Sequence, residues 1–285
     1  LALGAADIVV TEAGFGSDMG AEKFMHIKAA NSGKAPDCVV MNVTVRSMKL
    51  HGGAFGSRGG YRPSREELDA EDIEAVKRGA QGNLDRHIRN MAGFGMPVIV
   101  SINRFTADTD GELEALTAAA RASGAHAVTL TEVHANGGKG GEPLAKAVVS
   151  AIQDHVAAGR PFTPLFLKDA PVMEKVNGIA KRIYKAEGVV VEAKAKKQLA
   201  AIESWGYGHL PVCMAKTQYS FSHDAGQLGA PVGFTIPVRE FRLNAGAGFI
   251  VAVLGNMMTM PGLPKRPAAA DMDMDENGQL TGVFG

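Results

Sequence analysis

Three stretches of this 285-residue chain combine glycine with polar side chains in patterns that could bind an anionic ligand, and a fourth group is polar and irregular. In the first, residues 11–20 (TEAGFGSDMG), an apolar run enters a glycine-rich turn that opens a helical pattern. Such turns expose backbone N–H groups at a helix N-terminus, where ligands gather in open α/β sheets. Glu12, Gly14 and Gly16 are therefore candidates for the phosphate side of a nucleotide site. A tight connection without a ligand is the alternative, because the gap before Gly20 is one residue too long for G-x-G-x-x-G.

The second stretch, residues 44–53 (TVRSMKLHGG), places three nitrogen-bearing side chains directly after a strand pattern. Arg46, Lys49 and His51 together suit a phosphate or carboxylate, because cationic groups donate charge-assisted hydrogen bonds to such anions. A solvated edge with a surface histidine is the alternative. We favour the anion site because the donors are concentrated at the carboxyl end of one strand.

The third stretch, residues 132–141 (EVHANGGKGG), again follows a strand pattern and precedes a helix. Gly137 and Gly138 are candidates for the edge of a phosphate site, and a plain loop remains open as the alternative. Lys139 does not belong to a P-loop, because Gly140 follows it where G-x-x-x-x-G-K-[ST] requires Ser or Thr. No P-loop pattern occurs anywhere in the sequence.

The fourth group comprises two irregular, polar segments, residues 216–224 (KTQYSFSHD) and 258–267 (MTMPGLPKRP). Long loops of this kind often carry function. An ordered contact between domains or subunits is the alternative.

Two metal patterns are excluded. Asp271, Asp273 and Asp275 resemble the start of a calcium loop, but the sixth and twelfth positions are not the Gly and Glu that an EF-hand requires. A turn at Asn277 and Gly278 between two short strands explains the segment better. The eight histidines show no H-E-x-x-H spacing, so we predict no transition-metal site built by the protein.

The elements that position these residues alternate between short apolar strands and helices. Strands are predicted at residues 8–11, 38–45, 97–102, 127–133, 211–215, 234–238 and 249–254. Helices are predicted at residues 18–30, 64–78, 84–91, 110–122, 145–158 and 174–185, and residues 52–63 form a glycine-rich loop. This alternation predicts an α/β fold with mostly parallel sheets flanked by helices. Longer irregular loops after residue 205 indicate several domains, the last a smaller α+β domain, with boundaries near residues 95 and 205.

The composition excludes several classes of protein. Thirty Lys and Arg balance thirty Asp and Glu, so no basic excess favours nucleic acid or a membrane surface. No apolar run approaches the roughly 18 residues of a spanning helix. The two cysteines, Cys38 and Cys213, are far apart in the sequence, which is typical of a reducing, cytoplasmic location. Because the chain begins at Leu1 near an apolar run, we expect it to be a piece of a longer protein.

Four stretches, TEAGFGSDMGAEKF, TVRSMKLHGG, KTQYSFSHD and MTMPGLPKRPAA, resemble in order and spacing the formate–tetrahydrofolate ligase family. The second resembles a family signature, V-A-T-[IV]-R-A-L-K-x-[HN]-G-G. The chain agrees with it at Thr44, Val45, Arg46, Lys49, His51, Gly52 and Gly53, and departs from it at Asn42, Val43, Ser47 and Met48. The resemblance covers essentially the whole chain.

The resemblance implies an ATP-dependent ligase that forms 10-formyltetrahydrofolate from formate and tetrahydrofolate through formyl phosphate. It implies Mg²⁺ with ATP and stimulation by a monovalent cation, with no residue of this chain assigned to either ion. In the family, an aromatic residue after the strand corresponding to residues 97–102 stacks on the pterin, and Phe105 occupies that place. The opposing wall is a Trp, where this chain has His134, and Leu130 would line the same pocket. An imidazole offers less stacking area than an indole.

The resemblance also implies an organisation in domains. Residues 1–95 would be the C-terminal part of a P-loop-type nucleotide-binding domain, 96–205 a second α/β domain with the pterin wall, and 206–285 a third, smaller domain. The main catalytic residues of the family have no counterpart here, so we expect the C-terminal half of a homo-oligomeric ligase that forms no formyl phosphate alone. The alternative is a non-catalytic folate-binding or assembly subunit that needs a separate N-terminal half.

Overall fold

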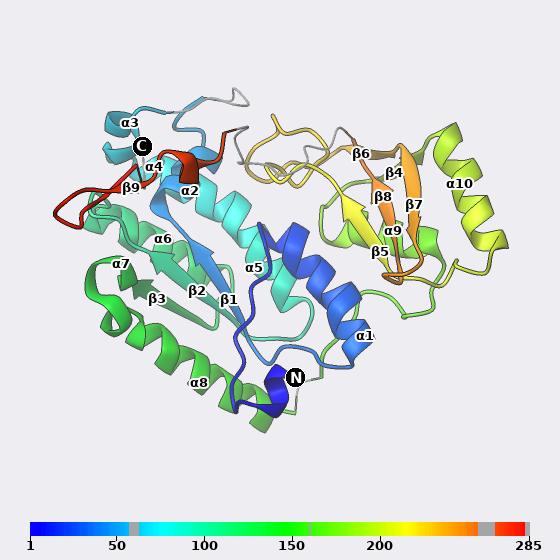
Figure 1. Ribbon diagram of the computed structural model, residues 1–285, viewed down its shortest axis with the longest axis horizontal. Helices are drawn as coiled ribbons and strands as arrows, with labels where there is room; N and C mark the ends of the chain where they lie inside the picture. The colour runs from blue at the N-terminus through cyan, green and yellow to red at the C-terminus, as the bar shows by residue number, and fades with distance from the viewer. Residues whose placement is uncertain (57–62, 160, 256–265, 283–285) are drawn as a thin grey trace. The chain divides into compact units, whose positions relative to one another are not determined.

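The computed structural model describes residues 1–56, 63–159, 161–255 and 266–282 (Figure 1). The chain divides into two compact units, Leu1–Gly255 and Asn256–Gly285. Part of the predicted glycine-rich loop, residues 57–62, and most of the polar segment 258–267 lie outside the described residues. The three-domain division of the sequence stays a prediction.

The first sheet of the larger unit consists of three parallel strands in the order β1–β2–β3. They are β1 (Val39–Val43), β2 (Val98–Asn103) and β3 (Ala127–Thr131). The register pairs Val43 with Ile102, and Ile102 with Leu130. The central strand β2 is buried over residues 98–102, which explains its continuous apolar run, because a strand covered on both faces needs no polar alternation. The strands predicted at 38–45, 97–102 and 127–133 are thus confirmed, although Val45 and Val133 already begin helices.

Helices connect these strands, and four of them begin with a side-chain cap. The helices are α2 (Val45–His51), α3 (Arg65–Asp69), α4 (Ile73–Gly79), η4 (Ala80–Leu84), α5 (Asp85–Ala92) and α6 (Asp110–Ala122). The side chains of Thr44, Ser64, Asp72 and Thr109 each accept a hydrogen bond from a backbone N–H three residues later, which satisfies a donor that the first turn leaves free. The helix predicted at 64–78 is two helices, because Ala70 is extended and Asp72 caps a new start.

Helices α2 and α4 approach each other closely through two glycines. A Cβ on Gly52 would lie 1.8 Å from the carbonyl oxygen of Ala75, and one on Gly79 would lie 2.1 Å from that of Met48. Only glycine permits this backbone contact. The contact fixes α2, which carries Arg46, against α4.

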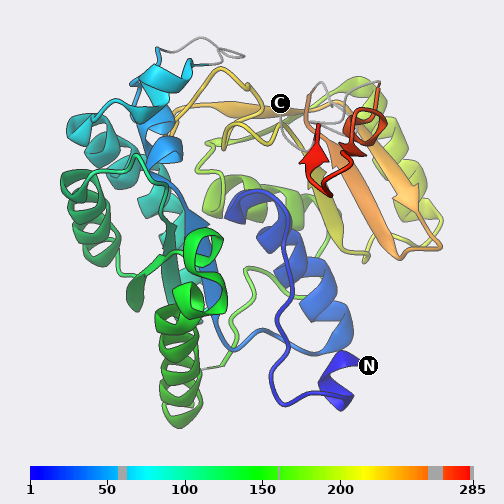
Figure 2. The ribbon, with the colours of Figure 1, turned by 60° about the vertical axis from the view of Figure 1, so that its left-hand side comes forward.

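Residues 17–32 form one wide helical run, composed of η2 (Ser17–Ala21), η3 (Phe24–Ala29) and α1 (Ala30–Ser32). Much of this run has π-helical hydrogen bonding. This hydrogen-bonding pattern is rare in proteins as a whole, and where it occurs it often lies at a functional site. η2 packs against α5 and η3 against β5 (Val212–Ala215). The run therefore stands between the first sheet and the strands that follow (Figure 2).

The second half of the larger unit is also α/β. Its helices are α7 (Val133–Asn136), η5 (Gly137–Gly141), α8 (Glu142–Ala157), α9 (Val172–Arg182) and α10 (Ala193–Ser204). Its strands are β4 (Gly188–Val191), β5, β6 (Thr235–Val238), β7 (Glu240–Asn244) and β8 (Phe249–Val253). β4 pairs with β6 and β5 with β8 in parallel, whereas β7 pairs antiparallel with β8. The sequence analysis did not predict β4, α10 or β7.

One predicted strand is wrong. Residues 8–11 adopt no regular structure, and Ile8 and Val10 are 55% and 90% exposed. The only regular element before them is the short η1 (Ala2–Gly4). A short apolar run becomes a strand only where another strand offers an edge, and within the described residues none pairs with it.

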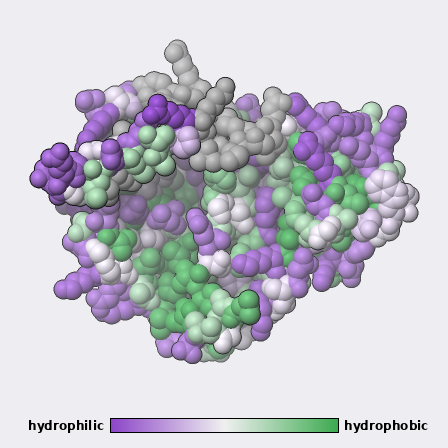
Figure 3. All heavy atoms as spheres, viewed as in Figure 1, coloured by the Kyte–Doolittle hydropathy of each residue, from purple (hydrophilic) through white to green (hydrophobic). Residues whose placement is uncertain are grey.

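The surface above the first sheet and α8 carries apolar side chains (Figure 3). Val40 of β1 is 44% exposed, and Val149 and Val156 of α8 are 41% and 64% exposed. Among the described residues, no helix is both long and apolar enough to span a membrane.

The described part of the smaller unit is a short 3-10 helix, η6 (Ala268–Ala270), and a hairpin of β9 (Asp273–Met274) and β10 (Leu280–Thr281). The strands are antiparallel, and Gly278 between them has φ of 77°. The carboxylate of Asp275 accepts hydrogen bonds from the backbone of Asn277 and Gln279. The predicted turn at Asn277 and Gly278 is confirmed.

We expect Gly79→Ala to destabilise the protein by about 1–3 kcal/mol, because the added methyl group overlaps the Met48 carbonyl and must push α2 and α4 apart. Urea unfolding measures the change. Gly82→Ala is the matched control, since its Cβ would meet only the Ala230 Cβ at 3.7 Å. Equal effects of the two substitutions would contradict the close approach.

Candidate functional site

A cavity of about 280 Å³ lies where β1 and β2 end. It is lined by Arg46, Arg65, Leu68, Asp69, Phe105, Thr106 and Ala107. Arg46 belongs to the first turn of α2, Phe105 to the loop after β2, and Asp69 to α3. The carboxyl ends of parallel strands are where α/β proteins bind ligands, so this cavity is the candidate site.

Phe105 is held by a tight turn. Its backbone N–H donates to Asp108 Oδ2 at 2.8 Å, and the Asp108 N–H donates to the Phe105 carbonyl at 3.1 Å. Burial raises the pKa of Asp108, and the hydrogen bond from Phe105 opposes this shift. The turn therefore presents the ring to the cavity from a fixed backbone.

Arg46 lies over that ring. Its guanidinium carbon is 4.3 Å from the centroid of Phe105, and its Nη2 donates to Asp69 Oδ1 at 2.7 Å. Asp69 also lies 3.5 Å from Arg65 Nε. The cavity thus combines an aromatic face with two guanidinium groups and one carboxylate.

Lys49, which the sequence predicted as an anion ligand, is buried and paired inside the protein. It is 1% exposed and forms an ion pair of 2.7 Å with the fully buried Glu112. Its Nζ also donates to the carbonyl oxygens of Leu68 and Ala70, at 3.2 and 2.7 Å. These partners use its three donors, so Lys49 holds α2, α6 and the end of α3 together and has none left for an anion.

His51 is separated from Arg46 because residues 45–51 form a helix and are not the end of a strand. The Nδ1 atom of His51 accepts a hydrogen bond of 3.1 Å from the Gly229 N–H. Asn83 Nδ2 donates to the Gly229 carbonyl at 2.9 Å. Burial lowers the pKa of His51, and Asp18 opposes this shift. His51 therefore anchors the loop that follows residues 216–224.

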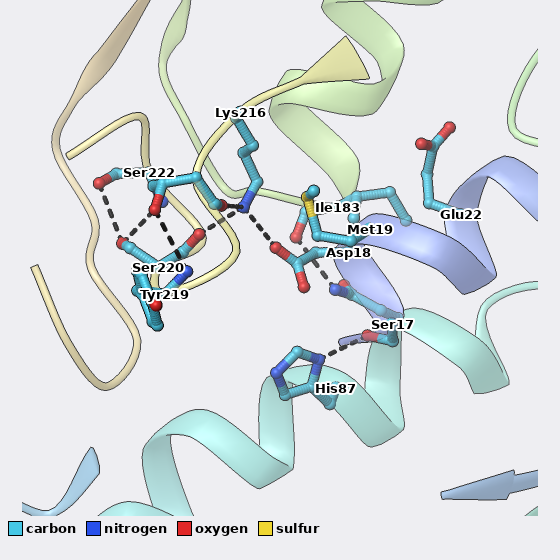
Figure 4. A network of polar contacts seen from close by, with 12 residues as sticks. Ser17, Asp18, Met19, Glu22, His87, Ile183, Lys216, Tyr219, Ser220 and Ser222 are labelled. Atoms are coloured by element: carbon cyan, nitrogen blue, oxygen red, sulfur yellow. Dashed lines mark hydrogen bonds and ion pairs between the residues drawn. The ribbon is translucent and has the colours of Figure 1, made fainter. Parts of the chain in front are cut away.

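A buried polar network joins the first and fourth predicted stretches (Figure 4). Asp18 Oδ2 and Lys216 Nζ are 2.6 Å apart, and both side chains are almost fully buried. Lys216 also donates to the carbonyl oxygens of Thr217 and Ser220. Burial lowers the pKa of Lys216, and the Asp18 carboxylate opposes this shift.

The hydroxyl groups of Ser220 and Ser222 extend this network. Ser220 donates to the Gln227 carbonyl at 2.6 Å, and Ser222 to the Asp224 carbonyl at 3.1 Å. The polar side chains of residues 216–224 thus shape their own loop.

His87 closes the network on the other side of Asp18. Ser17 Oγ lies 2.6 Å from His87 Nδ1, and the imidazole packs on Phe221 with ring centroids 4.4 Å apart. Burial lowers the pKa of His87 to about 4. The imidazole is therefore neutral at pH 7.

The glycine turn of residues 11–20 folds back on its own helix. The Gly20 N–H donates to the Gly14 carbonyl at 3.0 Å, and a Cβ on Gly20 would lie 2.2 Å from that oxygen. A Cβ on Gly16 would lie 2.6 Å from Asp18 Oδ1 and 2.9 Å from His87 Cε1, so Gly16 serves internal packing. Gly14 and Glu12 are exposed, and nothing lies within 4 Å of a Cβ on Gly14.

The residues expected on the pterin side follow neighbouring strands at the same edge. Leu130 lies in β3 and is 39% exposed, and His134 is exposed in α7, directly after β3. Arg104, the residue before Phe105, donates its N–H to the Thr131 carbonyl at 3.1 Å, and its Nη1 lies 3.4 Å from Glu132. The chain segments that carry Phe105 and His134 are therefore adjacent.

Gly137 and Gly138 are exposed, with open space where a Cβ would be. Gly140 closes their loop, because its carbonyl accepts from the Glu132 N–H at 3.1 Å and its Cβ would overlap Glu132. The backbone at Gly137 and Gly138 is thus accessible to a ligand.

Within the described ranges, no group of three His, Cys, Asp or Glu side chains gathers as metal ligands do. Mg²⁺ often binds through substrate phosphates and one or two carboxylates, so it needs no such cage. The described residues fit no resident metal ion, and we assign none.

Sequence reasoning missed the residues on which this region depends. Asp18 and Lys216 belong to the stretches at residues 11–20 and 216–224, but the sequence predicted no role for either of them, and none for His87. The available signal was position: His87 falls in the apolar stripe of Leu84, Ile88 and Met91, so its burial was predictable from helical spacing.

These features define an α/β protein with a cavity at the carboxyl ends of parallel strands, the edge at which proteins of this class bind ligands. The sequence profile of the family described as formate–tetrahydrofolate ligase matches residues 1–284. The chain belongs to this family.

Individual relatives agree. A protein named formate–tetrahydrofolate ligase from Ruegeria sp. (strain TM1040) is 50% identical over 283 residues, which are 99% of this chain and 48% of the relative. The proteins of that name from Roseobacter denitrificans and Hyphomonas neptunium are each 50% identical over the same shares. The chain therefore spans about half the length of the curated relatives it matches.

We expect the pKa of His87 to make the protein less stable in acid. Below pH 6.5 the unfolded chain takes up a proton that the folded chain refuses until about pH 4, so stability falls as the pH falls through this window. Between pH 6.5 and 4.5, the free energy of unfolding in urea should fall by about 1–3 kcal/mol less for His87→Gln than for the parent chain.

The matched control for this experiment is His209→Gln, because His209 is exposed. This variant measures what the loss of an exposed imidazole does to the pH dependence of unfolding. A parent-like slope for His87→Gln would show that His87 is not held neutral.

Proposed function

We propose that this chain serves the ATP-dependent formation of 10-formyltetrahydrofolate from formate and tetrahydrofolate. The observation that carries the proposal is Phe105, held at the carboxyl end of β2 in the cavity of a chain of this family. In this reaction a formate oxygen attacks the γ-phosphorus of ATP and ADP leaves. The N10 atom of tetrahydrofolate then attacks the formyl carbon, phosphate leaves, and N10 loses its proton.

The residues of this chain would act on the folate side. Phe105 offers a flat apolar face to the pterin. Leu130 lies near the end of the neighbouring strand β3, and His134 follows that strand at the same edge. Aromatic faces bind such rings by offset stacking. Positioning of N10 against the formyl carbon supplies a large part of the rate enhancement in a reaction of this type.

On the nucleotide side we propose the exposed backbone at Gly14, Gly137 and Gly138, together with Glu12. Arg46, predicted there from the sequence, would act on the folate side, because it contacts Phe105. Gly16, His51 and Lys49 would act indirectly, since each is engaged with other parts of the protein. Mg²⁺ bound to the ATP phosphates would neutralise charge on the transferred phosphoryl group. We further propose a monovalent cation as activator, a homo-oligomeric complete protein and a cytoplasmic location.

A second candidate function is a non-catalytic folate-binding or assembly subunit. It is favoured by the absence of a G-x-x-x-x-G-K-[ST] pattern from the sequence. Formation of ADP and formyl phosphate by the purified chain, given ATP and formate, would exclude it.

We expect Phe105→Ala to weaken tetrahydrofolate binding by about 1–3 kcal/mol, the range for losing an aromatic platform. Titration calorimetry with the purified chain measures the change. Trp205→Ala is the matched control, because Trp205 is an aromatic residue that is 65% exposed and does not line the cavity. Unchanged binding by Phe105→Ala removes this residue from the site.

The reverse substitution tests the opposing wall. We expect His134→Trp to tighten tetrahydrofolate binding by about threefold to tenfold, because an indole offers more stacking area than an imidazole. Since His134 is exposed, the substitution leaves the fold intact. The same titration measures the effect, and His209→Trp controls for a nonspecific gain from an exposed indole. If the two substitutions have equal effects, His134 does not face the pterin.

A further inference from the structure

One face of the Phe105 ring is already covered by Arg46. The Arg46 guanidinium lies 4.3 Å from the ring centroid, close to the separation of stacked groups in contact. A heterocycle inserted between them would need about twice that separation. One of the two groups must therefore move before a ligand can stack on this face.

Phe105 is the less movable of the two. Reciprocal hydrogen bonds of 2.8 and 3.1 Å with Asp108 hold its backbone, and Asp108 is 7% exposed. Arg46, in contrast, ends a long flexible side chain that is 28% exposed. Its described anchors are the ring and the partly exposed carboxylate of Asp69, and ion pairs of this exposure contribute little.

The covered state also leaves Arg46 incompletely satisfied. Its Nε atom is buried, and no acceptor for it exists among the residues that the structure describes. A buried donor without an acceptor is unfavourable. A guanidinium that swings away from the ring can regain an acceptor from water or from a ligand, so displacement carries a compensating gain.

We propose that Arg46 is an affinity-determining gate residue, whose guanidinium covers Phe105 in the free chain and is displaced by the flat ring that stacks there. This inference rests on the proposed function, because it takes Phe105 as the platform for the pterin. The gate disfavours ring compounds that offer the displaced guanidinium nothing. It admits those that carry a carboxylate, to which a guanidinium donates paired hydrogen bonds.

The binding test uses 6-methyltetrahydropterin, which has the ring system without carboxylates, and tetrahydrofolate, which has both. Calorimetry with the purified chain and Arg46→Met should show about threefold to tenfold tighter binding of the pterin. Tetrahydrofolate should gain less, because it loses its carboxylate partner. Unchanged or weaker pterin binding by Arg46→Met would overturn the gate and make Arg46 a wall of the site.

Arg65→Met is the matched control. It removes an equal charge from the same cavity and likewise takes an ion-pair partner from Asp69. Arg65 is 89% exposed, and among the described residues the cation–π contact with the ring belongs to Arg46. It should leave pterin binding unchanged. A gain equal to that of Arg46→Met would assign the effect to charge alone and overturn the gate.

A ligand-free measurement separates this proposal from the proposed function. In a urea double-mutant cycle of Arg46→Met and Phe105→Leu, the two substitutions should be coupled by about twofold to fivefold in the unfolding equilibrium constant. Absence of coupling overturns the gate even where tetrahydrofolate binds. If coupling is present but neither ring compound binds the parent chain or Arg46→Met, the folate platform fails, and with it the role of Arg46 as its gate.

Discussion

The buried ion pair between Asp18 and Lys216 is the constraint on which the arrangement of the larger unit depends. It connects the start of the helical run at residues 17–32 to the loop after β5, elements almost two hundred residues apart in the sequence. Both charges are removed from water, which is costly, so the pair is tolerated only because further hydrogen bonds satisfy the lysine. Removing one partner leaves an unpaired buried charge, a defect of about 3–5 kcal/mol.

This pair joins the stretches at residues 11–20 and 216–224, and many polar side chains of the predicted stretches have a structural task. His51 and Ser220 hold the backbone at Gly229 and Gln227, and Ser17 pairs with the side chain of His87. The glycines divide in the same way. Gly16 and Gly20 allow close packing, whereas Gly14, Gly137 and Gly138 leave backbone open to solvent. Each of these stretches therefore combines residues that hold the fold together with residues that are exposed and open to a ligand.

The contacts within the cavity are weaker than the buried contacts that support it. Lys49 and Glu112, both fully buried, fix α2 from behind, and Gly52 and Gly79 fix it against α4. The contact of Arg46 with Phe105 is a partly exposed cation–π interaction, of about 0.5–1 kcal/mol. Rigid supports thus carry an adjustable contact, as a ligand site requires: the ring stays in place while the side chain over it can change position.

Local sequence was sufficient where the physics is local. Apolar runs predicted β1, β2 and β3, and helical spacing predicted α6 at residues 110–122. Their alternation predicted an α/β fold with ligands at one edge. Local sequence failed where a partner decides: residues 8–11 find no strand to pair with, and β4 and β7 exist because β6 and β8 offer edges. Residue type alone also identified Arg46, Lys49 and His51 as cations. Only the tertiary structure decided that Lys49 is consumed by Glu112, that His51 holds a distant loop, and that Arg46 reaches Phe105, because burial and charge pairing depend on segments that the sequence places far apart.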